Sequence, residues 1–270
     1  MKVSVVIPVY NGMPFIKDAI ASVLDAQDVD LELIVVDDCS KDDTWEYVSQ
    51  LDDPRVTAVR NEQNLGATGN WNRALELATG DVVKLLCADD EITPHSLETQ
   101  SAILADPANA GVVLVAGRRR VIGPDGATVI AAHGLGRLRG RVDGSRALHS
   151  TVLGGTNVFG EPSSVMFRRD AAVRAGGFRS IYKFLPDLDF YSLLLQHGDV
   201  WCQADVTALF RVSVGSGSVG MVKIQAAQMR EFIRAVRAEG RIGALVAAIG
   251  GVRASANAWG RRVLYWRLAR

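Results

Sequence analysis

Short apolar runs rich in β-branched residues alternate with amphipathic stretches along the first hundred residues, and this alternation limits the fold more than any other feature. Such runs predict strands, and the stretches between them, with apolar residues three and four apart, predict helices. The predicted strands are Val3–Pro8, Leu31–Val36, Val56–Arg60, Val82–Ala88 and Val112–Ala116. Because strands that alternate with helices form parallel sheets, the sequence predicts an α/β fold with a mostly parallel sheet flanked by helices.

Polar side chains follow four of the predicted strands. They are Tyr10-Asn11, Asp37-Asp38, Asn61 and Asp89-Asp90. In open α/β sheets, ligands bind at the carboxyl ends of the strands. The sequence therefore predicts a binding edge that carries an aromatic ring, amide groups and four carboxylates.

The pair Asp89-Asp90 directly follows a buried apolar run and indicates a cation site. A divalent cation with oxygen ligands bridges carboxylates and phosphates, and it neutralises charge on a phosphate leaving group. This chemistry predicts transfer at a nucleoside diphosphate. The alternative interpretation is structural: the pair ends a strand ahead of a helix that Thr93 caps and Pro94 opens.

Two phosphate-binding motifs are missing from the sequence. No GxGxxG follows the first strand, where Pro8-Val9-Tyr10-Asn11-Gly12 stands, and no GxxxxGK[ST] occurs. A dinucleotide-binding fold is therefore disfavoured. Without such a loop, a cation held by Asp89-Asp90 is the expected means of neutralising phosphate.

Net neutrality conceals a strong charge asymmetry. Residues 1–110 carry 20 acidic and 7 basic residues, whereas residues 221–270 carry 2 acidic and 10 basic residues. The acidic front half disfavours nucleic acid as a partner.

Three cysteines far apart in sequence indicate a reducing, cytoplasmic setting. The first residues lack a signal peptide, and no apolar run is long enough to span a bilayer.

The pattern changes after residue 117. Short strands flank a turn at residues 123–126, and residues 133–160, rich in Gly and Arg, predict a long loop. A helix is predicted from about Asp187 to His197, ended by Gly198. We therefore expect a catalytic domain over residues 1–215, divided into residues 1–117 and 118–215, followed by a helical tail over residues 216–270.

Several of these stretches together resemble family 2 glycosyltransferases, which have the GT-A fold. The matching segments are Val5–Asn11, Leu33–Ser40 with Asp43-Thr44, Asn61–Gly66 and Gly80–Asp90. The similarity continues more loosely through Glu161–Ser164, Gly176–Phe178 and Pro186–Asp189, and does not clearly cover residues 215–270. It implies inverting, metal-dependent transfer from a nucleotide-sugar, most often a UDP-sugar, to a saccharide or lipid-linked acceptor in bacterial-type cell-surface polysaccharide or glycolipid synthesis.

The resemblance also implies roles for individual residues. Tyr10 stacks on the nucleotide base and Asp38 accepts a hydrogen bond from it, while Asp89 lies by the ribose or the metal. Asp90 holds Mn²⁺ or Mg²⁺ against the diphosphate, although the family usually has Asp-x-Asp where this chain has Ala88-Asp89-Asp90. The other expected nucleotide-sugar-binding residues are Pro8, Asn11, Asp37 and Asn64.

An inverting transfer needs a base that removes the proton of the acceptor hydroxyl. The resemblance implies Asp187 or Asp189 for this role. Residues two apart on a helix do not share a face, so only one should enter the site, and we favour Asp187. The alternative is that Asp187 only caps the helix and complements its dipole.

The basic tail allows two interpretations. Its arginines and aromatic residues, among them Trp259, Tyr265 and Trp266, are typical of a helix at a membrane surface, which predicts a peripheral protein on the inner face of the membrane. The alternative is a helix pair packed on the catalytic domain, with a solvated Arg face. Gly243, Gly250, Gly251 and Gly260 weaken the helix prediction itself.

Two other function classes remain open. A nucleotidyltransferase could use a similar sheet and metal carboxylates, but it should show an early basic, Gly-rich phosphate loop, which Tyr10–Phe15 does not supply. A degenerate domain could bind a nucleotide-sugar without catalysis. The carboxylates present at both expected sites argue against this last alternative.

Overall fold

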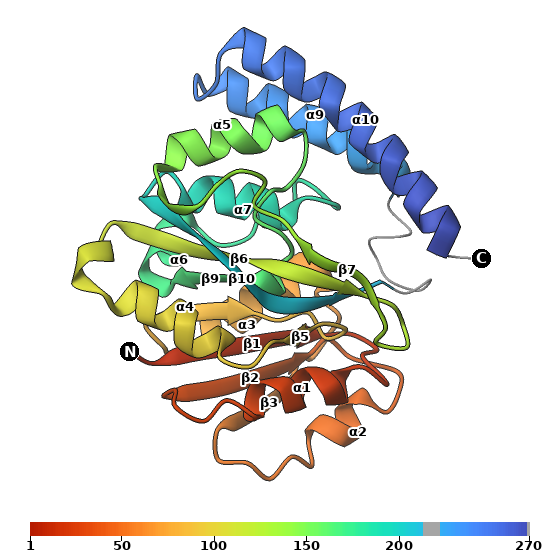
Figure 1. The fold of residues 1–270 in the computed structure, drawn as a ribbon. Helices are drawn as coiled ribbons and strands as arrows, with labels where there is room; N and C mark the ends of the chain where they lie inside the picture. The colour runs from red at the N-terminus through yellow and green to blue at the C-terminus, as the bar shows by residue number, and fades with distance from the viewer. Residues whose placement is uncertain (213–221, 269–270) are drawn as a thin grey trace.

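The computed structural model describes residues 1–212 and 222–268, which fold around one ten-stranded sheet with the order β3-β2-β1-β4-β9-β6-β10-β5 (Figure 1). Strand β7 pairs with β6, and β8 pairs with β10. The strands are β1 Val3–Val9, β2 Leu31–Asp37, β3 Val56–Arg60, β4 Val82–Leu85, β5 Glu91–Ile92, β6 Val112–Ile122, β7 Thr128–His133, β8 Gly140–Val142, β9 Val165–Arg168 and β10 Asp199–Arg211.

The sheet is parallel where the sequence predicts βαβ units. Strand β1 pairs in parallel with both β2 and β4, and β2 pairs in parallel with β3. Strand β9 lies antiparallel between β4 and β6, so β6 and its parallel neighbour β10 run in the same direction as β1. The predicted mostly parallel sheet is therefore confirmed, with β5, β7, β8 and β9 as its antiparallel members.

Helices cover both faces of the sheet. Helices α1 (Ile16–Leu24), α2 (Thr44–Val48) and α4 (Ser96–Ala105) contribute to one apolar core. The opposite core contains side chains of α3 (Gly66–Leu77), α5 (Gly144–Gly154), α6 (Arg169–Ala175), α7 (Pro186–Leu194), α9 (Val222–Ala238) and α10 (Ala244–Leu268). Because successive side chains of a strand point to opposite faces, Val5 and Ile7 of β1 enter the first core and Val6 enters the second.

The strand before the acidic pair is shorter than predicted. Strand β4 ends at Leu85, and residues 86–90 leave the ladder in a turn that directs Cys87, Asp89 and Asp90 toward one point. The capping predicted for the following helix is wrong. Helix α4 begins at Ser96, and the Thr93 hydroxyl instead donates to the Val206 carbonyl at 2.7 Å.

The prediction of a long loop over residues 133–160 is also wrong. This segment contains β8 and α5, a helix of 11 residues that Asp143 caps by accepting a hydrogen bond from the Arg146 amide at 3.0 Å. Helix α5 buries Leu148 and Val152 against the rest of the protein. Tertiary burial of this face overrides the Gly-rich composition.

The C-terminal helices α9 and α10 pack against each other, and α10 packs on α5. In Figure 1, α9 and α10 lie beyond α5 at the end of the molecule opposite α2. Helix α10 continues through Gly250 and lies close to α5 at this residue. A Cβ there would lie 2.4 Å from the Val152 carbonyl oxygen of α5, so glycine permits the close approach. The expected domain boundary at residues 215–216 lies outside the described residues, as do the side chains of Tyr265 and Trp266. Over the part of the chain that is described, we find no helix with the length and apolarity needed to cross a membrane.

Candidate functional site

A cavity of about 440 Å³ opens at the carboxyl ends of β1 and β2. Four predicted nucleotide-sugar-binding residues line it together: Pro8, Tyr10, Asp38 and Asn64. The Tyr10 side chain is 47 % exposed, so its ring is free to stack on a planar ligand. The remaining lining residues are Val9, Cys39, Lys41, Gly66, Ala67, Asn70 and Trp71.

Asp38 organises the wall of this cavity. Its carboxylate accepts hydrogen bonds from the amides of Leu65 (2.8 Å) and Gly66 (2.9 Å), and from the side-chain amide of Asn61 (2.8 Å). The Asn64 side chain donates to the Asp38 carbonyl at 2.9 Å. The carboxylate is buried and is therefore held in one orientation beside the cavity.

Asn11 and Asp37, also predicted at this site, do not line the cavity and have partners within the protein. Asp37 is buried, pairs with Arg60 at 3.1 Å and accepts hydrogen bonds from the Ser40 amide. Asn11 has a positive φ of 54° and accepts a hydrogen bond from the Lys41 amide at 2.8 Å. Both residues fix the loops around the cavity.

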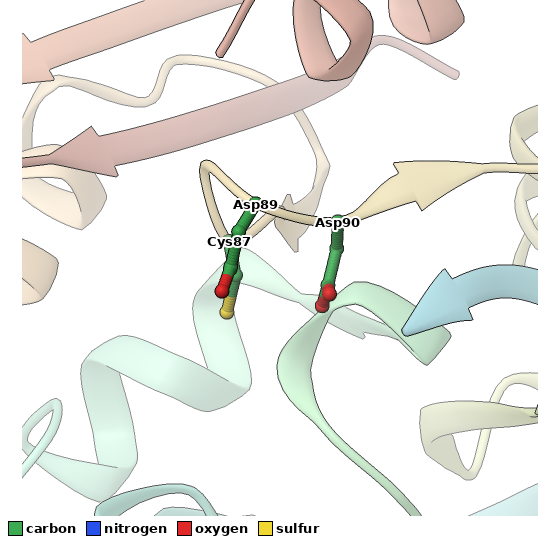
Figure 2. Close-up of side chains that lie close together, drawn as sticks. All are labelled: Cys87, Asp89 and Asp90. Carbon is green, nitrogen blue, oxygen red and sulfur yellow. The ribbon is translucent and has the colours of Figure 1, made fainter. Parts of the chain in front are cut away.

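Cys87, Asp89 and Asp90 form a compact cluster after β4. One ligand atom from each, a thiol sulfur and two carboxylate oxygens, lies within 4.8 Å of the other two (Figure 2). Burial raises the pKa of Asp89, and it raises the pKa of Asp90 well above the usual range with a further contribution from the charge of Asp89. Burial and the two carboxylates likewise raise the pKa of the Cys87 thiol.

Burial is the main common cause of these raised pKa values, and at Asp90 and Cys87 the negative charge of neighbouring carboxylates adds to it, where positive charge would offset it. A divalent cation would supply that charge. Carboxylate oxygens suit Mg²⁺ and Mn²⁺ alike, whereas a thiol is a soft ligand that favours transition metals over Mg²⁺. The donor set of the cluster therefore fits a divalent metal.

Asp89 and Asp90 differ in how much of each carboxylate is already bonded. Asp90 is buried, and its two oxygens accept hydrogen bonds from the Ser163 hydroxyl (2.6 Å) and the Arg211 amide (3.0 Å). Asp89 is half-buried, and the Arg211 guanidinium donates to its main-chain carbonyl at 3.0 Å. The more accessible of the two carboxylates is that of Asp89.

Asp187 lies in the first turn of α7, within electrostatic reach of the cluster. Its charge contributes to raising the pKa of Cys87. Burial, helped by the charge of Glu161, raises the pKa of Asp187 itself to about 7, although Asn157 donates a hydrogen bond to its carboxylate at 2.7 Å. The residue at the N-cap of α7 is Leu185, so Asp187 is not the N-cap residue, although it lies in the first turn, where a carboxylate complements the helix dipole.

Asp189 points to other partners. Its carboxylate accepts two hydrogen bonds from the Arg179 guanidinium, at 2.8 and 2.5 Å. The two carboxylates thus leave α7 in different directions, as expected for residues two apart on a helix. Of the two, Asp187 is the one that the structure brings close to the Cys87–Asp89–Asp90 cluster.

The residues that support the site come from segments distant in sequence. Asn157, Glu161 and Ser163 lie between α5 and β9, and Arg211 ends β10. Glu161 also forms an ion pair with the buried Arg119 of β6. Sequence reasoning noted Glu161–Ser164 only as part of the family resemblance and treated Cys87 only as a reduced cysteine. Nothing in the local sequence relates Asn157 or Arg211 to the acidic residues.

A family model, Glycosyl transferase family 2, matches residues 4–174. The chain belongs to this family. It is 36 % identical over 202 residues to the uncharacterized protein MT1568 of Mycobacterium tuberculosis, covering 72 % of this chain and 61 % of the relative. A putative teichuronic acid biosynthesis glycosyltransferase of Bacillus subtilis, TuaG, is 42 % identical over 100 residues, covering 36 % of this chain and 40 % of the relative.

Solved structures confirm the GT-A fold expected from the sequence. The S. aureus protein TarS (residues 1–349), in complex with UDP-GlcNAc, superposes with a TM-score of 0.70 at 20 % identity, covering 88 % of this chain and 66 % of that chain. The mannosyltransferase PcManGT from Pyrobaculum calidifontis, in complex with GDP-Man and Mn²⁺, gives a TM-score of 0.61 at 18 % identity, covering 97 % and 75 %. The chain spans less than two thirds of the length of the curated relatives above.

Proposed function

We propose that the protein is an inverting, metal-dependent glycosyltransferase that moves a sugar from a nucleoside diphosphate to an acceptor hydroxyl. One observation carries the proposal. A cavity lined by Tyr10 and Asp38, a group of side chains around Asp89 that could hold a metal, and a half-buried carboxylate of raised pKa at Asp187 are gathered around the carboxyl ends of β1, β2 and β4. These are the groups that donor binding, leaving-group stabilisation and proton removal require.

The cavity beside β1 and β2 is the proposed nucleotide site. Tyr10 would stack on the base, and Asp38 and Asn64 would bond its polar edge, with Pro8 forming part of the floor. Asn11 and Asp37 would act by holding the surrounding loops. We propose UDP as the nucleotide. The ligand in the TarS complex is UDP-GlcNAc, whereas the Pyrobaculum enzyme was solved with GDP-Man.

The proposed metal ligands are Asp89 and Asp90, with Asp89 making the principal contact because its carboxylate is the more accessible. A divalent cation bound there, Mn²⁺ or Mg²⁺, would neutralise charge on the diphosphate as it leaves. Asp90 would orient the turn through Ser163 and Arg211. The Cys87 thiol would favour Mn²⁺ over Mg²⁺.

Asp187 is the proposed base. The acceptor oxygen would attack the anomeric carbon while its proton passes to the Asp187 carboxylate, and the bond from that carbon to the diphosphate oxygen would break on the opposite side. This in-line geometry inverts the anomeric configuration. A pKa of about 7 suits a base that operates near neutral pH. Asp189, paired with Arg179, would position α7.

The proposed acceptor is a saccharide, free or lipid-linked, in bacterial cell-surface polysaccharide or glycolipid synthesis. Relatives with such printed names support it, among them a Campylobacter jejuni GalNAc(5)-diNAcBac-PP-undecaprenol beta-1,3-glucosyltransferase that is 38 % identical over 119 residues. The match covers 43 % of this chain and 37 % of that relative. A lipid-linked acceptor would require a cytoplasmic enzyme to work at the inner face of the membrane.

Thermal-shift measurements with a panel of nucleotide-sugars, with and without Mn²⁺, test the donor site, because a ligand that binds the native state raises its apparent stability. We expect a UDP-sugar to stabilise the protein more with Mn²⁺ than without. The anomeric configuration of the product, determined by NMR with the donor so identified, then tests inversion. A protein that binds no nucleotide-sugar under any condition, or that transfers a nucleotidyl group, would refute the proposal.

A further inference from the structure

The outward face of α10 carries a row of exposed apolar side chains. Leu245 (73 % exposed), Ile249 (36 %), Val252 (72 %) and Trp259 (70 %) are separated by four, three and seven residues, a spacing that aligns them along one side of a helix. Helix α10 lies at the outer end of the molecule in Figure 1. The row therefore faces away from the protein.

This row is distinct from the apolar side that α10 uses for folding. Ala254 and Ala258 are buried on the inner side, and Gly250 lies against Val152 of α5. The helix thus has an apolar side packed on the catalytic fold and a second apolar row without a partner among the described residues. Core packing does not explain the second row.

Basic side chains run along the apolar row. Arg230, Arg234 and Arg237 are exposed on α9, and their spacing places them on one side of that helix. A hydrogen bond of 2.9 Å from the Arg230 guanidinium to the Ser255 hydroxyl fixes the first of them at one flank of the α10 row. Arg253 lies exposed on the other flank, where its guanidinium donates to the Leu153 carbonyl at 3.0 Å.

We propose that this face of α9 and α10, formed by the apolar row and its flanking arginines, docks on an anionic lipid bilayer. Apolar side chains would enter the boundary between head groups and acyl chains while arginines contact anionic head groups, as amphipathic surface helices do. Charge favours lipid over a second copy of the chain. A two-fold contact through this face would bring the two arginine rows toward each other.

Docking here would place the acceptor half of the site near the lipid. Arg253 and the neighbouring Asn257, whose side chain donates to the Gly154 carbonyl at 2.8 Å, hold the end of α5. The segment after α5 contains Asn157, whose side chain donates a hydrogen bond to the Asp187 carboxylate. This functional consequence rests on the proposed transferase activity, whereas the docking surface itself does not.

Vesicle flotation of the full-length protein tests the surface. We expect flotation with phosphatidylglycerol vesicles and little with phosphatidylcholine vesicles, and a loss of flotation as salt is raised. Replacing Val252 and Trp259 with Ser should abolish it, whereas the matched change Val173→Ser, at a 67 % exposed position on α6, should not.

A second pair of variants isolates charge. Arg234→Gln with Arg237→Gln should weaken partitioning by about 10-fold or more, since each basic residue near an anionic surface contributes roughly a factor of five. Arg73→Gln with Arg174→Gln removes the same net charge from α3 and α6 and should leave partitioning within about 2-fold.

Three outcomes would overturn the docking proposal. These are equal binding to both lipids, unchanged flotation in the α10 variants, and a dimer in light scattering that Val252→Ser with Trp259→Ser converts to monomer. UDP-sugar binding measured on the same samples separates the two proposals, because loss of donor binding with intact flotation refutes only the transferase.

Discussion

Asp187 and Asp189, two residues apart on α7, lie in opposite electrostatic surroundings. Asp187 is half-buried, and desolvation with the charge of Glu161 raises its pKa to about 7, whereas Asp189 is buried and shares two hydrogen bonds with the Arg179 guanidinium. A base must release and accept a proton near the working pH, and a carboxylate held by arginine does so poorly. This contrast leads to the first prediction.

Asp187→Asn should lower kcat by about 10²-fold or more, because general base catalysis contributes on that order, and should leave donor binding nearly unchanged. Asp189→Asn should mainly lower the melting temperature, since it breaks the ion pair with Arg179. Steady-state kinetics, donor titration and thermal unfolding of both variants distinguish these effects. The opposite assignment of phenotypes would make Asp189 the base.

The pH dependence follows from the same pKa. The unprotonated form of Asp187 is the base, so kcat/KM should rise as pH increases through about 7. The folded state holds this proton more tightly than the unfolded state. The free energy of unfolding should therefore decrease as the pH is raised from about 4 to about 7. Asp187→Asn should therefore be more stable than the wild type at pH 8, by at most about 4 kcal/mol for a shift of about three pKa units.

The two carboxylates of the metal cluster should respond differently to substitution. Asp89→Asn should abolish metal-dependent UDP binding without loss of stability. Asp90→Ala should weaken binding and also lower the melting temperature, because it leaves the Ser163 hydroxyl and the Arg211 amide without their acceptor, at about 1–3 kcal/mol for each group. Calorimetric titration of UDP with and without Mn²⁺, alongside thermal unfolding, measures both effects. Unchanged metal dependence in Asp89→Asn would contradict the ligand assignment.

Cys87 should make the metal site thiophilic. We expect Cd²⁺ to produce a thiolate-to-metal ultraviolet absorption band in the wild type, to produce none in Cys87→Ser, and to keep it in the control Cys39→Ser. Cys87→Ser should also bind Mn²⁺ less selectively over Mg²⁺. A band that persists in Cys87→Ser would exclude the thiol from the site.

Tyr10 should contribute to nucleotide binding through its ring and not its hydroxyl. Tyr10→Ala should weaken UDP binding by roughly 5- to 100-fold, the range expected for removal of a base–aromatic stack, while Tyr10→Phe should remain close to the wild type. Fluorescence or calorimetric titration of UDP measures the difference. Equal weakening in both variants would assign the interaction to the hydroxyl.

Two adjacent glycines of α10 provide a matched test of its packing on α5. Gly250→Ala should destabilise the protein by about 1–3 kcal/mol, since its Cβ would lie 2.4 Å from the Val152 carbonyl oxygen. Gly251→Ala meets no atom within 4 Å and should stabilise the helix by up to about 1 kcal/mol. Denaturant unfolding of the two variants gives the comparison. Similar effects at both positions would mean that α10 does not pack on α5 as described.

The sequence by itself determined the parallel half of the sheet and the family. Strand periodicity and the polar residues at strand ends depend on local side-chain order, so β1, β2 and β3 could be predicted within one or two residues. Because parallel strands carry those polar residues to one edge, Tyr10 and Asp38 could be expected together. The adjacency of Asp89 and Asp90 likewise follows from covalent order.

Tertiary structure alone decided which acidic residue has a raised pKa and which has a cationic partner. The Asp187 carboxylate accepts a hydrogen bond from Asn157, 30 residues away in sequence. The Asp90 carboxylate accepts one from the main-chain amide of Arg211, 121 residues away. Helix α5 and the passage of α10 through Gly250 also depend on burial against distant segments, which overrides local propensity. Burial and long-range charge are properties of the folded chain, so a local sequence pattern contains no signal for them.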